Sequence, residues 1–171
     1  MGTNNSKKLI RRGRIIRYAP LVLWVAVIFT ASSTVGASKN TSMIIRPLLE
    51  WLFPNEPAAV IDAYHNYIRK LAHFTEYALL GFLAARAYWN SSFRVLRRFW
   101  FGWAFLTVFA IASLDEYNQS FNNLRTGSFY DTLLDASGGL TMILALVLYH
   151  RISDFGFRIS DFSKSTRSDK G

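Results

Sequence analysis

The sequence predicts an all-α fold, a polytopic membrane protein built as a compact bundle of about four transmembrane helices. The first observation is composition, because 51% hydrophobic and 16% aromatic residues are high proportions for a soluble domain of 171 residues. The second is the gathering of the apolar residues in four stretches, and the third is the clustering of basic residues between them. The chain has no cysteine, which excludes disulfides, a thiolate nucleophile and cysteine-bound metal centres.

Each apolar stretch is close to the roughly 17 residues at which a helix first spans the hydrocarbon core of a bilayer. The stretches cover residues 18–35, 71–89, 99–114 and 132–149. Residues 38–53, after the first stretch, alternate apolar and polar residues at helical spacing. This predicts a short helix on the outer membrane surface, either an anchor or a lid over a site. Pro57 then favours the start of a helix that continues into the second stretch.

The basic residues predict the orientation of the chain. Fifteen of the twenty lie in the N-terminal arm, in the connection between the second and third stretches, or in the tail, and five lie on the other side. Both termini should therefore be cytoplasmic in a multi-pass protein of the bacterial inner membrane. The predicted organisation is a basic arm at 1–17, a transmembrane domain at 18–150 and a tail at 151–171 that repeats the sequence RISDF. A cleavable signal peptide ending near residue 37 is the alternative for the N-terminus.

The net charge of +9 also bears on partners. It indicates membrane lipids with anionic headgroups rather than nucleic acid, because no aromatic residues interleave the basic clusters into a binding groove. The sequence does not predict an oligomeric state.

The second stretch opens with ionisable residues, which are costly in lipid and commonly mark a functional site. Lys70, His73, Glu76 and Tyr77 are three or four residues apart, so they share one face of a helix. A cationic partner would keep Glu76 ionised, and Lys70, His73 and Arg125 are the candidates. The alternative is that Lys70 only extends to lipid headgroups and that His73 is a packing residue.

Further polar residues follow the third stretch and open the fourth. Asp115, Glu116 and Gln119 share a helix face, and a loop with Arg125 leads to Asp131. Asp131 can form a capping box at the start of the fourth helix. Asp135 lies one turn further on the same face, where two like charges repel, so it needs a proton, a cation or a metal. Gly138 and Gly139, near that face, would let a neighbouring helix approach closely.

These motifs resemble the VanZ-like family of bacterial membrane proteins. The resemblance covers about residues 24–149 and rests on RKLAHFTEYALLGFL, DEYNQSF, Arg125, Asp131-x-x-x-Asp135 and Gly138. Two positions depart from the family pattern: Asn118 stands where many members have histidine, and NNLR replaces a Pro-Gly-Arg turn. The family's founding member is associated with low-level teicoplanin resistance, so the resemblance implies a role in the cell envelope.

Three hypotheses follow for function. In the first, an outward-facing polar cavity binds an envelope lipid, a precursor or a glycopeptide antibiotic, and contributes to low-level resistance. Its candidate ligand-binding residues are Lys70, His73, Glu76, Tyr77, Asp115, Glu116, Gln119, Arg125, Asp131 and Asp135. In the second, a membrane hydrolase or transferase uses His73, Glu76 and Asp135 as catalytic residues. The third is a structural or regulatory membrane partner.

An enzyme is the less favoured class, because the chain has no HExxH motif, nucleophile elbow or phosphate-binding loop. No cofactor is expected. If a divalent cation bound, the oxygen-rich ligand set would suit magnesium, calcium or manganese better than zinc.

Overall fold

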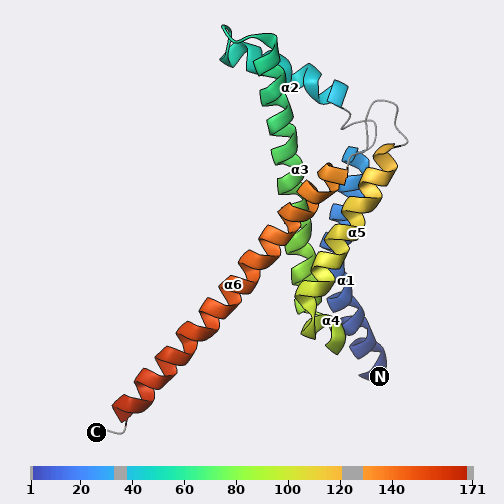
Figure 1. Ribbon diagram of the computed structural model, residues 1–171. Coiled ribbons are helices and arrows are strands. Elements are labelled where there is room, and N and C mark those ends of the chain that lie inside the picture. Colours follow the sequence, from blue (N-terminus) through green and yellow to red (C-terminus); the bar gives the residue numbers. More distant parts are fainter. Residues whose placement is uncertain (1, 33–37, 121–128, 169–171) are drawn as a thin grey trace.

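The chain folds into helices connected by short segments (Figure 1). The computed structural model describes residues 2–32, 38–120 and 129–168, and within these it contains helices and no strand. The helices are α1 (Gly2–Thr30), α2 (Ser38–Leu52), α3 (Ala58–Trp89), α4 (Arg94–Arg98), α5 (Trp100–Ser120) and α6 (Phe129–Ser168). The prediction of an all-α fold is confirmed.

The second and fourth predicted stretches fall within α3 and α6, and the third begins one residue before α5. The first lies in α1 as far as Thr30, and its last residues, 33–35, lie outside the described residues. Helix α2 begins where the surface helix was predicted. Pro57 stands immediately before α3 as its N-cap residue. A proline is favoured at this boundary because the first amides of a helix have no intrahelical acceptor. The predicted tail at 151–171 is helical as far as Ser168. This part of the tail is the end of α6, which extends beyond the other helices (Figure 1).

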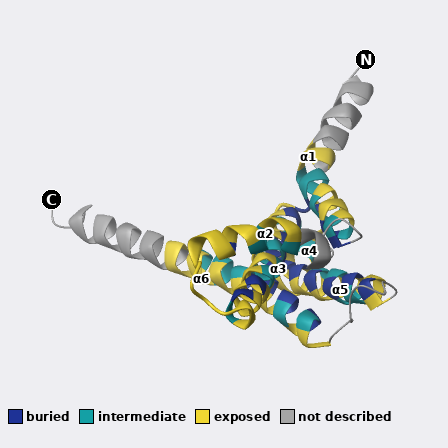
Figure 2. Ribbon diagram, turned by 90° about the horizontal axis from the view of Figure 1, so that it is seen from above, coloured by how far each residue is buried: buried dark blue, intermediate teal, exposed yellow. Residues whose placement is uncertain are grey.

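Helix α3 is the centre of the packing, with α1, α5 and α6 against it. Buried residues gather around it when the molecule is seen from above (Figure 2). Many of them are small. The core includes Ile28, Tyr77, Leu80, Ala84, Ala85, Ala87, Ala104, Val108, Ala112 and Ile143. Such small side chains let helices approach closely, which is typical of helix packing in membranes.

Glycines mark the closest approach, where α6 crosses α3. A Cβ atom added to Gly81 would lie 2.7 Å from the main-chain oxygen of Gly139. A Cβ on Gly138 would overlap the main-chain oxygen of Phe74, and one on Gly139 would overlap the side chain of Val108 on α5. Helices α3 and α6 are therefore in direct main-chain contact at this crossing, and α5 closes the third side.

Hydrogen bonds between distant residues define the two ends of the bundle. At one end, Arg17 donates to Ser92 at 2.9 Å. At the other, Ser32 donates to Asp115 at 2.6 Å. Helices α1 and α5 thus run from the first end to the second, and α3 and α6 run back. We call the end with Arg17 and Ser92 the basic end and the end with Ser32 and Asp115 the acidic end.

The short helix α2 packs against the first turns of α3. Arg46 forms an ion pair with Asp62 at 3.3 Å, and the rings of Phe53 and Tyr64 lie 5.3 Å apart. A hydrogen bond to Glu50 raises the pKa of Arg46 above its usual value, and the charge of Asp62 adds to this effect. These contacts hold α2 at the start of α3, two or more turns away from His73.

Hydropathy singles out one helix. Among the described residues, only the segment Phe129–Ser153 of α6 is long and apolar enough to cross a membrane. The apolar part of α1, Ile15–Thr30, is shorter. Lys70, His73 and Glu76 lower the hydropathy of α3, so composition alone does not identify it as a span. The number of spans stays a prediction.

Candidate functional site

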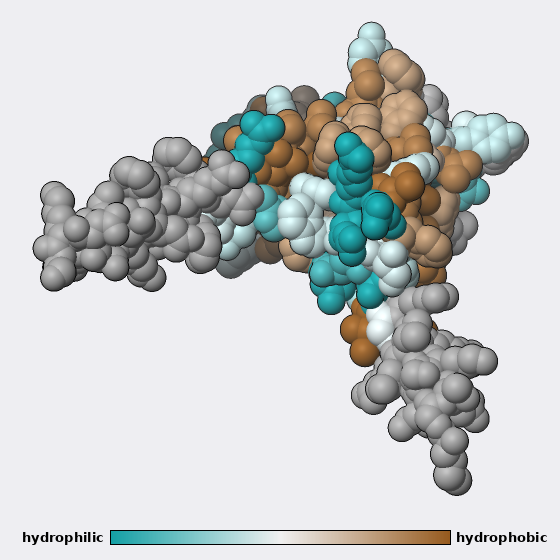
Figure 3. All heavy atoms as spheres, turned by 90° about the horizontal axis from the view of Figure 1, so that it is seen from below, coloured by the Kyte–Doolittle hydropathy of each residue, from teal (hydrophilic) through white to brown (hydrophobic). Residues whose placement is uncertain are grey.

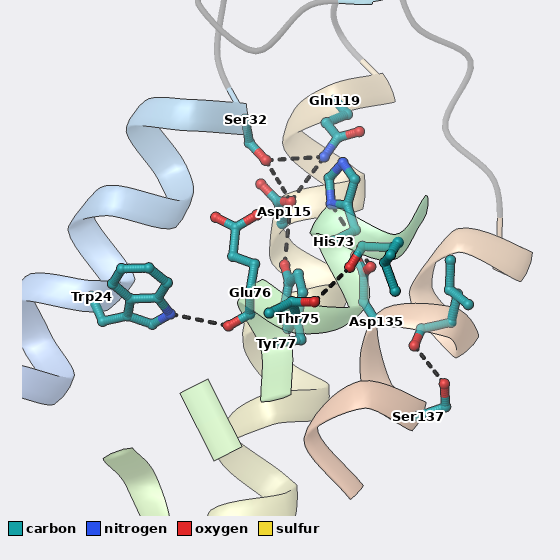
Figure 4. A network of polar contacts seen from close by, with 12 residues as sticks. Trp24, Ser32, His73, Thr75, Glu76, Tyr77, Asp115, Gln119, Asp135 and Ser137 are labelled. Atoms are coloured by element: carbon teal, nitrogen blue, oxygen red, sulfur yellow. Dashed lines mark hydrogen bonds and ion pairs between the residues drawn. The ribbon is translucent and has the colours of Figure 1, made fainter. Parts of the chain in front are cut away.

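A carboxylate buried between three helices forms the centre of the acidic end (Figure 4). Asp115 on α5 is fully buried. Its Oδ2 atom accepts hydrogen bonds from Ser32 Oγ at 2.6 Å, from Gln119 Nε2 at 2.8 Å and from Tyr77 OH at 3.2 Å. Burial of a charge is unfavourable unless donors replace water, and three donors converge here on one oxygen. The network therefore links the end of α1 to α3 and α5.

Two further contacts complete this network. Gln119 Nε2 also donates to Ser32 Oγ at 3.2 Å, so one amide contacts both the hydroxyl and the carboxylate. About two turns before Ser32, on α1, Trp24 Nε1 donates to the main-chain oxygen of Glu76 at 3.1 Å. Helix α1 is thus fixed to α3 by hydrogen bonds as well as by apolar packing.

A second buried carboxylate lies on α6. Asp135 is 3% exposed, and its Oδ1 atom is 3.8 Å from Nδ1 of His73 on α3. A protonated His73 would give Asp135 an opposite charge, which is one of the three ways in which the sequence could accommodate this residue. The described residues contain no group of three or more histidine, aspartate or glutamate side chains placed to hold a metal ion.

Two carboxylate oxygens of the acidic end accept no hydrogen bond from the described residues, although one of them, Oδ1 of Asp135, faces Nδ1 of His73 at 3.8 Å. Oδ1 of Asp115 and Oδ1 of Asp135 are both buried and accept no hydrogen bond within the described part of the chain. A negative charge on Asp135 would be disfavoured by its burial and by the neighbouring acids, which are Asp115, Glu116, Asp131 and Glu76. Buried acceptors are normally satisfied, so these two oxygens are suited to a donor or a cation.

The structure places the predicted site residues at different depths. Tyr77, Asp115 and Gln119 form one hydrogen-bonded group, and His73 and Asp135 form a pair. The side chain of Glu76 points toward the first group (Figure 4). Glu116 and Asp131 are half-buried, and Lys70 is exposed. Arg125 lies outside the described residues. Gly138 and Gly139 lie at the crossing with α3, directly below the cluster.

Two residues of the site were missed by sequence analysis. Ser32 makes the shortest bond to Asp115, and Trp24 holds the main chain of Glu76. The available signal was the segment FTASS, where the first apolar stretch ends in hydroxyl residues. A hydroxyl at the end of an apolar helix needs a polar partner, and here the partner is 83 residues away in the sequence.

The arrangement does not resemble a nucleophilic triad. Ser32 donates to Asp115, while His73 lies near Asp135, so the hydroxyl, the imidazole and the carboxylate do not form one continuous relay. The enzyme hypothesis stays a prediction.

Together, the fold and the site define an all-helical protein with a buried cluster of carboxylates and hydrogen-bond donors at one end of its helix packing. The chain belongs to the VanZ/LLP1 family, whose model matches residues 18–150. The predicted family is confirmed. No curated protein and no solved structure matches the chain significantly.

Proposed function

We propose that this protein crosses the bacterial inner membrane with α1, α3, α5 and α6, and that both termini are cytoplasmic. Exposed apolar side chains on all four helices support this arrangement. They include Val22, Leu23, Val27, Leu79, Phe82, Leu106, Phe109, Leu144 and Leu148. An apolar surface of this extent is unfavourable in water and is matched by lipid.

The charge distribution supports the proposed orientation. Arg86, Arg94, Arg97 and Arg98 lie at the basic end, and basic residues are favoured on the cytoplasmic side. The acidic end then faces outward. Helix α2 would lie on the outer membrane surface as an anchor, because Met43, Ile44, Leu48 and Trp51 are exposed along it.

Single cysteines test this topology, because the natural chain has none. Asn55→Cys places a thiol in the segment between α2 and α3, and Ser92→Cys places one between α3 and α4. An impermeant maleimide added to intact cells should label the first and not the second. Labelling of Ser92→Cys alone would show that the topology is the inverse of the proposed one. Equal labelling of both variants would refute a crossing by α3.

The acidic end would bind a donor group of an envelope ligand, such as the hydroxyls or amines of a lipid-linked precursor or a glycopeptide. The observation that carries this proposal is the pair of buried carboxylates, Asp115 and Asp135, that each keep one oxygen without a hydrogen bond. Half-buried Glu116 and Asp131 beside them would form the rim through which a ligand enters. Such binding would account for a contribution to low-level glycopeptide resistance.

Asp135→Asn tests this binding, because it removes the ionisable carboxyl group and keeps the size of the side chain. The chain is expressed in a glycopeptide-sensitive host, and teicoplanin susceptibility is measured together with protein abundance in the membrane. Glu56→Gln is the matched control, since Glu56 is an exposed acid in the segment before α3. We expect Asp135→Asn to abolish the protection that the natural chain gives, at unchanged abundance, and Glu56→Gln to keep it.

Two outcomes would contradict the binding proposal. If Asp135→Asn lowers abundance in parallel with protection, the cluster is a structural network that holds the helices together. If Asp135→Asn protects as well as the natural chain, the open carboxylate oxygen of α6 has no part in the function.

A further inference from the structure

The basic end contains a cavity that is separate from the buried carboxylates of the acidic end. It has a volume of about 310 Å³ and lies between the last turns of α3, the start of α5 and the middle of α6. Its walls include Phe82, Arg86, Trp89, Trp100, Leu146 and His150. We propose that this cavity binds one anionic phospholipid of the inner leaflet, with the phosphate at Arg86 and His150 and the acyl chains along Phe82 and Leu146.

The wall residues change from polar to apolar along the helix axis. Phe82 precedes Arg86 by four residues on α3, and Leu146 precedes His150 by four on α6. Residues four apart lie one above the other on a helix, separated by about 6 Å. Both helices run toward the basic end, so both apolar residues are on the side nearer the middle of the bundle. A lipid has the same polarity, with its phosphate at the surface and its chains directed inward.

The rim of the cavity is a set of rings in contact. Trp89 and His150 are stacked, with ring centres 4.2 Å apart and planes 9° apart. Trp100 lies edge-on to Trp89 at 5.3 Å and is only 7% exposed. These contacts join α3, α5 and α6 at the level where tryptophan is favoured in membrane proteins, the boundary between lipid and water.

The charge of this end selects an anion. No aspartate or glutamate occurs in residues 77–114 or 136–153, whereas Arg86, Arg94, Arg97, Arg98 and Arg151 fall in these ranges. Among the described residues, no carboxylate pairs with Arg86. An aromatic cavity can also bind a quaternary ammonium group, but the surrounding arginines would repel that cation. A phosphate offers Arg86 a bidentate acceptor instead.

The view from below supports the choice of a lipid. Hydrophilic side chains gather near the middle of this face, and hydrophobic side chains surround them (Figure 3). A headgroup could contact the hydrophilic centre while its chains remain beside the hydrophobic surface. Basic cavities between helices on the cytoplasmic side of a membrane are suited to anionic headgroups.

The test is lipid binding to the purified full-length chain in detergent, followed by native mass spectrometry. The chain is titrated with phosphatidylglycerol and, separately, with phosphatidylcholine. We expect the first phosphatidylglycerol to bind about tenfold more tightly than phosphatidylcholine, and Arg86→Gln to remove this preference. Leu146→Trp, which fills the apolar part of the cavity, should weaken the binding of both lipids at this site.

Arg94→Gln is the matched control, because Arg94 is an exposed arginine at the same end that does not line the cavity. It should change the affinity by less than about twofold. Equal losses for Arg86→Gln and Arg94→Gln would show general attraction to a basic surface and overturn the proposal. Equal binding of the two lipids by the natural chain would also overturn it.

Glycerol phosphate distinguishes a lipid from a soluble anion. If it displaces the bound phosphatidylglycerol at equal concentration, the cavity is a site for a free phosphate ester and the lipid proposal is wrong. The inference relies on the proposed membrane placement and not on the ligand of the acidic end. Asp135→Asn should therefore leave phosphatidylglycerol binding unchanged, which separates this test from that of the resistance role.

Discussion

Replacing Gly81 with alanine tests the main-chain contact on which the helix packing depends. The new Cβ atom would lie 2.7 Å from the main-chain oxygen of Gly139 and 3.0 Å from its Cα atom. This is about 0.7 Å short of the 3.4 Å at which ordinary contact begins. A main-chain oxygen in a helix cannot turn away as a flexible side chain can, so α3 and α6 must separate. The separation loosens the packing of every residue along their contact.

Two opposing effects set the size of the change in stability. Alanine in place of glycine stabilises a helix interior by up to about 1 kcal/mol. Overpacking of a tight contact costs about 1–3 kcal/mol, so we expect a net loss of about 1–2 kcal/mol. For a chain of this length, each kcal/mol corresponds to a shift of about 2–4 °C in Tm. Gly81→Ala should therefore lower Tm by about 2–8 °C in a thermal unfolding experiment followed by helical circular dichroism.

Gly102→Ala is the matched control, since a Cβ atom at Gly102 on α5 would meet nothing within 4 Å. Only the gain in helix propensity remains, so its Tm should rise by about 2–4 °C. The opposite signs of the two variants are the test. If both raise Tm equally, the helices do not approach as closely as the structure shows, and the reasoning from main-chain contact is wrong.

Three further predictions concern the hydrogen bonds of the acidic end. Tyr77→Phe removes one donor to Asp115 and should lower the free energy of unfolding by about 1.5–3 kcal/mol in denaturant unfolding; an unchanged value would mean that the carboxylate is satisfied without it. Ser32→Ala should lower the free energy of unfolding by a similar amount. The loss in the double variant should differ from the sum of the two single losses, because both donors share one oxygen, and strict additivity would contradict that sharing. Trp24→Phe should cost about 1 kcal/mol by loss of its bond to the main chain of Glu76, and no loss would show that apolar packing alone holds α1.

The positions of the helices could be predicted from the sequence because they depend on local patterns. Apolar stretches of sufficient length, the proline at position 57 and the amphipathic spacing of 38–53 each act within one segment. Helices α1, α2, α3, α5 and α6 follow these patterns. Whether α3 crosses the membrane could not be predicted from hydropathy, because the ionisable residues that indicate a functional site on α3 also lower its mean hydropathy. The same residues therefore predict a site and weaken the evidence for a span.

The partners within the site could be predicted only in part. Helical spacing placed Asp115 beside Gln119, since both lie on α5 four residues apart. The spacing does not show which face of α6 meets α3, so the sequence predicts only that Asp135 needs a proton, a cation or a metal. The proximity of His73 to Asp135 depends on the rotation of one helix against another. Contact between Ser32 and Asp115 likewise depends on tertiary packing and has no local pattern.

The glycine crossing also affects how the acidic end could recognise a ligand. Gly81 is one turn beyond Tyr77 on α3, and Gly138 is one turn beyond Asp135 on α6. Main-chain contact at these glycines sets the separation of the two helices, and hence the separation of the groups one turn above. The cluster cannot widen around a large group without the separation of α3 and α6. The proposed ligand must therefore present a small donor to carboxylates whose positions are already fixed, and such preorganisation favours selectivity because little ordering remains to be done on binding.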